Sequence, residues 1–340
     1  MSRSVLVTGA TGFLGSNAIA ALQQIPGVRI IAACRSPEKL PRSFTGEVRA
    51  GDLRDPGYRR EVVQQVGAVC HCGTWGAMWG HAEQERAWFF EPAKDLLEQS
   101  IEAGVGRFLL ASTVAIAARP TRGEPLDDHA PGALTGFWPH VDELVRLDRL
   151  MREHAHRGTT MVSMRLGHFV GRGNRLGLVP AIIPRLRTRL VPWLAGGRKR
   201  LPLVDGVDLG RGFALAATAE GLEGYESFHI CGPELPTLRE VFSYVADRSG
   251  SPRPLFSAPQ WAGYGFARLM EALHPLVGGR APFLTRAIVH VAEDWNCPTD
   301  HARERIGFVP RKPWRESVDE SIEELRAEGI PWPSLGQPVT

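Results

Sequence analysis

The sequence has few cysteines and no long hydrophobic run. Its five cysteines form no Cys-x-x-Cys pair, and an odd number in a chain of 340 residues argues against a disulfide framework. No apolar run approaches the roughly 18 residues that a membrane-spanning helix needs. The N-terminus reaches a strand-like segment, 4–8, without the charged region, apolar core and cleavage site of a signal peptide. These absences predict a protein of the reducing cytoplasm without an integral membrane segment.

Acidic residues are missing from one long stretch. Residues 154–204 contain no Asp or Glu but ten Arg or Lys. The net charge of the whole chain is only +3, which is too small to indicate a nucleic-acid partner. The stretch is either a binding surface for an anionic or carrier-linked small molecule or an ordinary solvated basic face.

What the sequence does contain is an alternation of short apolar runs and amphipathic helical patterns. This alternation is typical of βαβ units around a parallel sheet. The expected strands are 5–8, 29–34, 48–51, 68–72, 108–112, 160–166 and 226–231. The expected helices are 16–24, 59–66, 92–103, 141–154 and 314–328. After Gly167 the sequence becomes rich in Gly, Pro and Arg, so a second region is expected to start there.

A glycine-rich turn joins the first expected strand to the first helix, with the sequence Thr8-Gly9-Ala10-Thr11-Gly12-Phe13-Leu14-Gly15. A tight turn, the approach of a pyrophosphate and close helix packing would exclude a Cβ atom at Gly9, Gly12 and Gly15. The free N–H groups of the helix that begins near Phe13 would face the phosphates. Strand, loop and helix follow in the required order, so the motif favours a dinucleotide site over a turn without a ligand.

The end of the second expected strand discriminates between the two nicotinamide dinucleotides. An acidic residue there accepts the ribose hydroxyls, whereas an Arg meets a 2′-phosphate. The strand ends with Cys34 and is followed by Arg35 and, shortly after, Lys39. Arg35 lies about 20 residues after the glycine loop, as this role requires. A solvated loop Arg is the alternative, but the pattern favours NADP(H) over NAD(H).

The glycine loop and six later segments resemble the extended short-chain dehydrogenase/reductases, which form the NAD(P)-dependent epimerase/dehydratase and 3β-hydroxysteroid dehydrogenase-like superfamily. The six later segments are 51–53, 108–113, 165–171, 201–209, 228–237 and 300–310. The resemblance covers almost the whole chain. It implies an α/β fold, a Rossmann-type doubly wound parallel sheet with a smaller, mainly helical C-terminal substrate region. We expect residues 1–170 and about 205–232 to bind the dinucleotide, and about 171–204 and 233–340 to bind substrate.

The resemblance also implies which residues contact the cofactor. Asp52 and Leu53 match the pair at the adenine, Cys72 and Gly73 match the strand end along the ribose, and His168 matches the chain beside the nicotinamide carboxamide. Capping of a helix by Asp52 and core packing of Cys72 are the alternatives. The cofactor-binding residues predicted in this way are Gly9, Thr11, Gly12, Phe13, Leu14, Gly15, Arg35, Asp52, Leu53, Cys72, Gly73 and His168.

The catalytic pattern that the resemblance implies is incomplete. The family uses a Ser or Thr to orient the substrate oxygen, a Tyr to exchange its proton, and a Lys four residues later. At these positions the sequence has Thr113, His140 and Leu144, and a shift of two residues places Trp138 and Asp142 there instead. The tyrosines lie in other elements and are Tyr58, Tyr225, Tyr244 and Tyr264.

Three interpretations of this departure stay open. In the first, His140 supplies the proton as hydride leaves NADPH, because imidazole acts as an acid or base near neutral pH. In the second, hydride positioning carries the rate and a water, Asp142 or Glu143 handles the proton. In the third, the chain binds cofactor without turnover, as a sensor or partner protein. The alternative for His140 is a solvent-facing histidine at a helix start, after Pro139.

The segment 73–80 follows the fourth strand, where members of the family build part of the substrate pocket. Trp75 and Trp79 in this segment, together with Trp138, predict an apolar or aromatic substrate. Trp88 and Trp193 are candidates for further walls. The apolar stretch 261–277 is interpreted as a lid, with domain packing and a peripheral membrane contact as rivals. Candidate phosphate-binding residues, by the resemblance, are Arg185, Arg187 and Arg198.

The sequence thus predicts an NADP(H)-dependent reductase or dehydrogenase without a metal. Its substrate would be a carbonyl or secondary alcohol of a small, mostly apolar metabolite, with Thr113 and His140 as catalytic residues. A catalytically silent NADP(H)-binding protein and a nucleotide-sugar epimerase or dehydratase are the alternatives. The resemblance also implies a possible homodimer through helices 92–103 and 141–154.

Overall fold

The computed structural model describes residues 4–118, 123–277 and 281–328. Seven strands form one parallel sheet in the order β10-β6-β5-β4-β1-β2-β3. The strands are β1 Ser4–Thr8, β2 Arg29–Cys34, β3 Glu47–Ala50, β4 Ala68–His71, β5 Arg107–Thr113, β6 Thr160–Leu166 and β10 Tyr225–Ile230. The order reverses direction between β1 and β4, which confirms the predicted doubly wound Rossmann-type fold.

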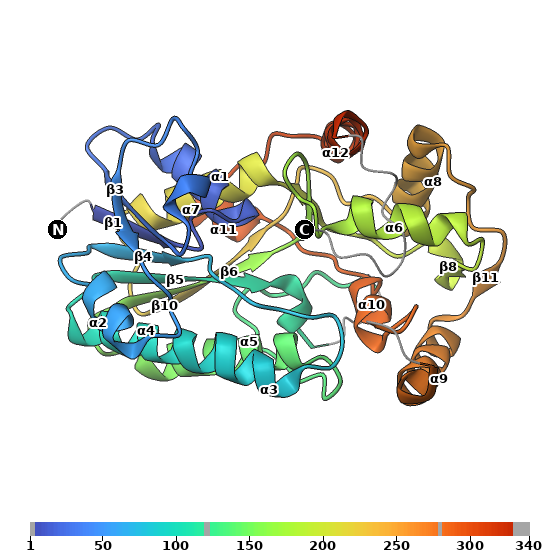
Figure 1. Ribbon diagram of the computed structural model, residues 1–340, viewed down its shortest axis with the longest axis horizontal. Coiled ribbons are helices and arrows are strands. Elements are labelled where there is room, and N and C mark those ends of the chain that lie inside the picture. The colour runs from blue at the N-terminus through green and yellow to red at the C-terminus, as the bar shows by residue number, and fades with distance from the viewer. Residues whose placement is uncertain (1–3, 119–122, 278–280, 329–340) are drawn as a thin grey trace.

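Helices cover both faces of this sheet (Figure 1). One face carries α1 Phe13–Leu22, α7 Gly206–Thr218 and α11 Asp300–Ile306. The other carries α2 Pro56–Val62, α4 Glu91–Glu102 and α5 Pro139–His154. Two separate hydrophobic clusters fill these layers, so the central strands are buried on both sides and read as continuous apolar runs.

The remaining elements gather beyond the carboxyl ends of the strands (Figure 1). Two short parallel strand pairs lie there, β7 His168–Val170 with β9 Leu203–Asp205, and β8 Trp193–Leu194 with β11 Ser257–Ala258. The helices of this region are α6 Leu178–Arg187, α8 Leu238–Ser249, α9 Gln260–Val277, α10 Arg286–Val291 and α12 Trp314–Ala327. A third hydrophobic cluster holds them together, which agrees with the predicted helical C-terminal region.

Two helices, α1 and α2, begin three residues earlier than the amphipathic pattern indicates. α2 starts at Pro56 because the side chain of Asp55 accepts a hydrogen bond from the N–H of Gly57 at 2.8 Å. α1 starts at Phe13, directly after Gly12, whose extended backbone ends the glycine loop. Apolar periodicity detects the buried face of a helix, whereas the cap determines its first residue.

A widened turn interrupts the long helix on the second face. Helix α3 Ala82–Glu85 passes into a π-helical turn, η2 Arg86–Phe90, before α4 continues. Pro92 near the start of α4 has no N–H to donate to the preceding turn, so the ordinary ladder of hydrogen bonds cannot be complete there. π-helical turns of this kind are often found at functional sites.

Single-turn 3₁₀ helices in the described part of the chain are η1 Pro37–Lys39, η3 Val114–Ile116 and η4 Ala195–Gly197. Among the described residues, no helix combines the length and hydropathy needed to cross a membrane. All five cysteines are free and buried. Burial raises the pKa of the Cys70 thiol to about 12 and that of Cys72 well above its usual range.

Candidate active site

A cavity of about 1620 Å³ runs along the carboxyl ends of the strands and into the C-terminal region. This is the edge at which open parallel sheets bind their ligands. Of the predicted site residues, the structure brings these to its wall: Gly9, Thr11, Gly12, Phe13, Leu14, Arg35, Asp52, Leu53, Cys72, Gly73, Trp75, Trp79, Thr113, Trp138, His140 and His168. Gly15 is the exception, because it packs under the loop.

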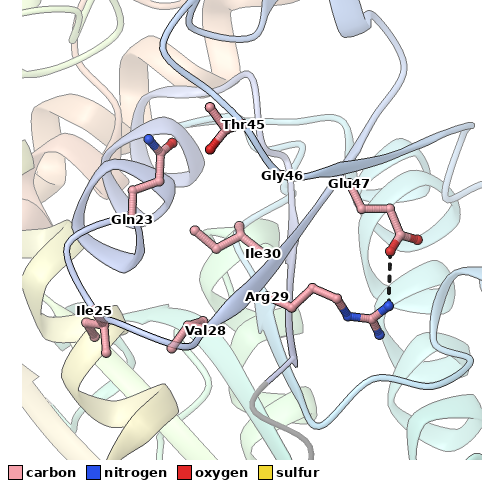
Figure 2. Close-up of a pocket in the computed structure, with 8 residues that line it drawn as sticks. All are labelled: Gln23, Ile25, Val28, Arg29, Ile30, Thr45, Gly46 and Glu47. Atoms are coloured by element: carbon pink, nitrogen blue, oxygen red, sulfur yellow. Dashed lines mark hydrogen bonds and ion pairs between the residues drawn. The ribbon is translucent and has the colours of Figure 1, made fainter.

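A second hollow, of about 540 Å³, lies at the opposite edge, beside the amino ends of β2 and β3 (Figure 2). It is lined by Gln23, Ile25, Val28, Arg29, Ile30, Thr45, Gly46 and Glu47. Its two charged residues, Arg29 and Glu47, neutralise each other at 3.3 Å. The chemistry of the molecule therefore concentrates in the larger cavity.

The glycine loop has the shape that a pyrophosphate needs. Gly9 has φ +62°, and a Cβ there would lie 2.7 Å from the backbone nitrogen of Gly73. A Cβ on Gly15 would lie 2.2 Å from the carbonyl oxygen of Gly9, so this glycine allows α1 to pack against the loop. No side chain caps α1 and no acidic residue lies in its first turn, which leaves its N–H groups available to an anion. The residues present fit a dinucleotide.

Two arginines line the cavity beside Asp52 and Leu53, the pair that the resemblance assigns to the adenine. Arg35 follows β2 as predicted, and Arg54, which the sequence interpretation missed, lines the same wall. Arg54 pairs with Asp52 at 2.6 Å and lowers the pKa of that carboxyl to about 2. Asp52 does not cap α2, because Asp55 does. In the sequence, the one signal for a second cationic residue beside Arg35 was that Arg54 lies two positions after Asp52.

Two histidines also line the cavity: His71 is buried, and His168 is half-buried with its Nε2 atom covered. His71, at the end of β4, shares a hydrogen bond of 2.8 Å with the Thr8 hydroxyl. Burial lowers the pKa of His71 and of His168 to about 4. Among the described residues, neither Nε2 atom has a hydrogen-bond partner. His168 lies where the sequence places the nicotinamide contact, and His71 was not predicted.

The end of β5 supplies two hydroxyls. Thr113 is half-buried, and its Oγ1 accepts a hydrogen bond from the N–H of Ala115 at 3.2 Å. Its own hydroxyl hydrogen stays available to a substrate oxygen in the cavity. Ser112 also lines the cavity, and its buried Oγ has no hydrogen-bond partner within the described part of the chain.

His140 lies in the first turn of α5 and is not a solvent-facing helix-start residue. Its Nδ1 lies 3.1 Å from Oε2 of Glu85, whose side chain is fully buried. The other oxygen of Glu85 accepts a hydrogen bond from the N–H of Ala77 at 2.7 Å. A carboxylate held in this way keeps the proton on Nδ1 and leaves Nε2 as the nitrogen for a ligand. Glu85 was missed because it lies 55 residues from His140 and belongs to no motif.

A model of the NAD dependent epimerase/dehydratase family matches residues 5–231 of this sequence. The chain belongs to this family. Membership of this family indicates that the chain is an NAD(P)-dependent enzyme of the short-chain dehydrogenase/reductase type. The glycine loop and the strand order of the sheet agree with this assignment.

Individual relatives cover almost the whole chain. A 4-hydroxy-2-methyl-3-oxo-4-farnesyl-3,4-dihydroquinoline-1-oxide ketoreductase from Stigmatella aurantiaca is 25% identical over 324 residues, 92% of this chain and 94% of the relative. Sterol demethylase protein B from Methylococcus capsulatus is 24% identical over 341 residues, 96% of this chain and 99% of the relative. The crystal structure of the UDP-glucose 4-epimerase of Thermus thermophilus with NAD superposes with a TM-score of 0.68, at 20% identity, covering 95% of this chain and 99% of that structure.

The sequence analysis found neither the tyrosine nor the lysine at the positions that the resemblance implies. Leu144, at the lysine position, lines the wall one helical turn after His140. No lysine lines the cavity among the described residues, and Tyr58 is the one tyrosine that does. The hydroxyl of Tyr58 donates to the carbonyl of Arg49 at 2.5 Å, near the adenine end. His140, which the sequence analysis assigns to the tyrosine position, does line the cavity.

Aromatic side chains form part of the cavity wall. Trp75 packs edge-on against Trp88 at 5.3 Å between ring centroids, and Nε1 of Trp138 donates to the carbonyl of Ala77 at 3.0 Å. Trp79 packs edge-on against His274 at 4.5 Å. Trp193 does not contribute, because it is buried in the third hydrophobic cluster.

One of the three candidate phosphate-binding arginines reaches the cavity. Arg185 lines its wall, and its guanidinium donates to the carbonyls of Ala181 at 2.7 Å and Phe283 at 3.4 Å. Burial lowers the pKa of Arg185, and no carboxylate of the described residues pairs with it. Arg187 and Arg198 are exposed and lie off the cavity wall, so the structure does not support them in this role.

One further cluster has the chemistry of metal ligands. His129, Glu226 and His301 approach one another outside the cavity. Arg305 already pairs with Oε1 of Glu226 at 2.5 Å, so a guanidinium supplies the positive charge beside this carboxylate.

Proposed function

We propose that this protein reduces a carbonyl group of a mostly apolar metabolite with NADPH. The observation that carries the proposal is the pairing of the buried Glu85 with His140, which lines the cavity that begins at the glycine loop. NADPH, when bound, supplies a hydride to the carbonyl carbon and leaves as NADP⁺. The chain must then hold the carbonyl oxygen and give it one proton.

Thr113 and His140 divide this work. The Thr113 hydroxyl donates a hydrogen bond to the carbonyl oxygen and orients it. Protonated His140 donates its Nε2 proton to the same oxygen as the alkoxide forms, so carbonyl plus hydride plus proton gives the alcohol. Glu85 stabilises the imidazolium that precedes transfer and holds the ring in place through Nδ1. Glu85 is a positioning residue, because it acts through His140.

The cofactor preference rests on the adenine end. A 2′-phosphate placed there would meet Arg35 and Arg54 and no unpaired carboxylate, because Asp52 is held by Arg54. Charge-assisted hydrogen bonds from guanidinium to phosphate are among the stronger ones in proteins. This arrangement supports NADP(H) over NAD(H).

The substrate class rests on the cavity wall and on the relatives. The wall beyond Thr113 is formed by aromatic and aliphatic side chains, including Trp75, Trp138 and Phe266. One relative is named for a 3-oxo compound that carries a farnesyl group, and another for a sterol. Both names describe molecules with a large apolar part, so we infer a substrate of this class.

A nucleotide sugar is the second candidate substrate. The half-buried Arg185 on the cavity wall, without a carboxylate partner among the described residues, suits a phosphate or carboxylate of the ligand. The missing tyrosine and lysine speak against epimerase chemistry. Arg185 also fits an apolar substrate that carries one anionic group, so it does not displace the first proposal.

The test is NADPH consumption with a panel of ketones that carry prenyl or polycyclic apolar groups. His140→Gln is expected to lower kcat by about 100-fold or more, because it removes the proton donor. Glu85→Gln is expected to lower kcat by about tenfold and to change the pH–rate profile, because the imidazolium loses its carboxylate. Gly76→Ala is expected to act like Glu85→Gln, because its Cβ would lie 2.9 Å from Nδ1 of His140.

The exposed histidine His156 provides the matched control, His156→Gln, which should keep the wild-type rate. Full activity of His140→Gln would overturn the role of His140. Binding of NADPH without consumption of any ketone would favour a silent binding protein. Interconversion of UDP-sugars without net NADPH consumption would favour the epimerase alternative.

A further inference from the structure

The exposed hydrophobic side chains of this protein are unevenly distributed. Among the described residues, fifteen large hydrophobic side chains are exposed, and eight of them belong to α9 or to the two segments beside it. This cluster, called the α9 patch below, consists of Leu190, Leu255, Phe256, Trp261, Phe266, Leu269, Leu273 and Leu276. A concentration of this size marks an interaction surface, whereas single exposed apolar residues need no explanation.

Helix α9 is apolar on both sides. Its inner side packs through Gly263, Ala267 and the buried Glu271. Trp261, Leu269 and Leu273 follow one another at spacings of one or two helical turns on the outer side. Trp261 is 77% exposed and Leu276 is 85% exposed, so this side has no cover within the described chain. Figure 1 shows α9 outside α10, at the end of the molecule far from β1 to β3.

Arginines without an acidic partner among the described residues lie beside the α9 patch, whereas the exposed Asp247 near Leu255 is paired with Arg253. Residues 154–204 and 251–270, which contribute most of the patch and its surroundings, contain no Asp or Glu. Arg189 and Arg268 are exposed beside the patch residues Leu190 and Leu269. The single acidic residue of α9, Glu271, faces inward and pairs with Arg286 at 2.6 Å. A surface with Trp and Leu side chains beside arginines suits an anionic membrane surface.

The patch is continuous with the cavity. Leu190, Phe256 and Phe266 belong to the patch and also line the cavity. An apolar molecule on the outer surface of α9 can therefore pass into the cavity along side chains that are all apolar. A partner made only of protein would also cover the patch, but the arginines and the absence of acidic residues favour anionic headgroups.

We propose that the α9 patch docks this protein onto an anionic lipid bilayer, with α9 lying in the plane of the headgroups. Trp261, Leu269, Leu273 and Leu276 enter the boundary between headgroups and acyl chains, and Arg189 and Arg268 meet the lipid phosphates. The cavity then opens toward the bilayer and receives a lipophilic substrate from it. The route of the substrate rests on the proposed function, whereas the docking does not.

The test is flotation of the full-length, untagged protein with vesicles of phosphatidylcholine mixed with phosphatidylglycerol. The wild-type protein is expected to float with these vesicles and to bind vesicles of pure phosphatidylcholine more weakly. Each arginine at an anionic surface contributes about fivefold in binding, so added salt should weaken the association. The double variant Leu269→Glu/Leu273→Glu is expected to lose binding by at least about tenfold.

The control is Val309→Glu, which changes an exposed apolar residue outside the α9 patch and should float like the wild type. Wild-type protein that stays at the bottom with anionic vesicles would overturn the proposal. So would a wild-type dimer in solution that the double variant breaks, since the patch would then join two copies of the chain. NADPH consumption with a water-soluble ketone tests the reductase separately, because it needs no vesicle.

Discussion

His71 and His168 are buried as neutral rings, and this makes the folded protein sensitive to acid. Their folded-state pKa of about 4 lies below the ordinary histidine value of about 6.5. The unfolded chain therefore takes up the protons first. The stability that these rings contribute is complete above about pH 6.5 and is lost as the pH falls toward 4.

We expect His71→Asn to reduce the loss of stability between pH 7 and pH 5 by about 2 kcal/mol, because the amide does not titrate. Asn keeps a polar atom near the position of Nδ1, which contacts Thr8. The measurement is the free energy of unfolding in urea at both pH values. His156→Asn changes an exposed histidine and serves as the control. An unaltered pH dependence in His71→Asn would contradict the assignment.

At the level of single residues, the sequence led to cavity residues that belong to a local pattern. Thr113, Arg35 and His140 were selected by counting along the chain and do line the cavity, while their roles stay predictions. Glu85 and His71 could not be found in this way, because their importance comes from burial and from partners distant in the sequence. Pairings of this kind depend on tertiary packing and have no local signal.

At the level of elements, the close contact between α1 and α7 depends on a glycine, which has no side chain at the point where the helices meet. A Cβ on Gly210 of α7 would lie 2.2 Å from the carbonyl oxygen of Asn17 on α1. We expect Gly210→Ala to destabilise the protein by about 2 kcal/mol or more, because the helices would have to separate.

Gly265 of α9 provides the opposite case, because a Cβ there meets nothing within 4 Å. Gly265→Ala is expected to stabilise the protein by about 0.5 to 1 kcal/mol, through helix propensity alone. Urea unfolding of the two variants and the wild type provides the comparison. Equal effects of the two substitutions would show that α1 and α7 do not pack as closely as described.

The sequence predicted the strands better than the details of the helices. The central strands read as continuous apolar runs, and all seven strands were located to within one or two residues, including the edge strand β3, which is not buried. The π-helical turn η2 was missed, although Pro92 marks the point where the hydrogen-bond ladder fails. A proline permits several distortions, and the packing of Phe89 and Phe90 in the core selects this one.

At the level of the whole molecule, the cofactor should act as a stabilising ligand. A ligand that binds only the folded chain at about 100 times its Kd contributes about 2.7 kcal/mol. We expect NADPH to raise Tm by about 5 °C or more, and NADH at the same concentration by less.

The arginine at the end of β2 should account for that difference. Arg35→Ala is expected to weaken NADPH binding by about 10- to 100-fold while leaving NADH binding nearly unchanged, because it removes a charge-assisted contact to the 2′-phosphate. Arg42→Ala, at another exposed arginine, is the control. Thermal unfolding with each cofactor measures both effects. Equal shifts with NADPH and NADH in the wild type would contradict the cofactor preference.

The five buried thiols have a consequence for the lifetime of the native protein. Every cysteine is buried in the folded chain, and burial raises the pKa of Cys70 and Cys72, so these two thiols are both covered and protonated. A thiol reagent in solution can therefore react only after the structure opens. The rate of thiol labelling therefore reports the rate at which the Rossmann sheet opens spontaneously. A bound dinucleotide, which would cover the wall at Cys72, should lower this labelling rate.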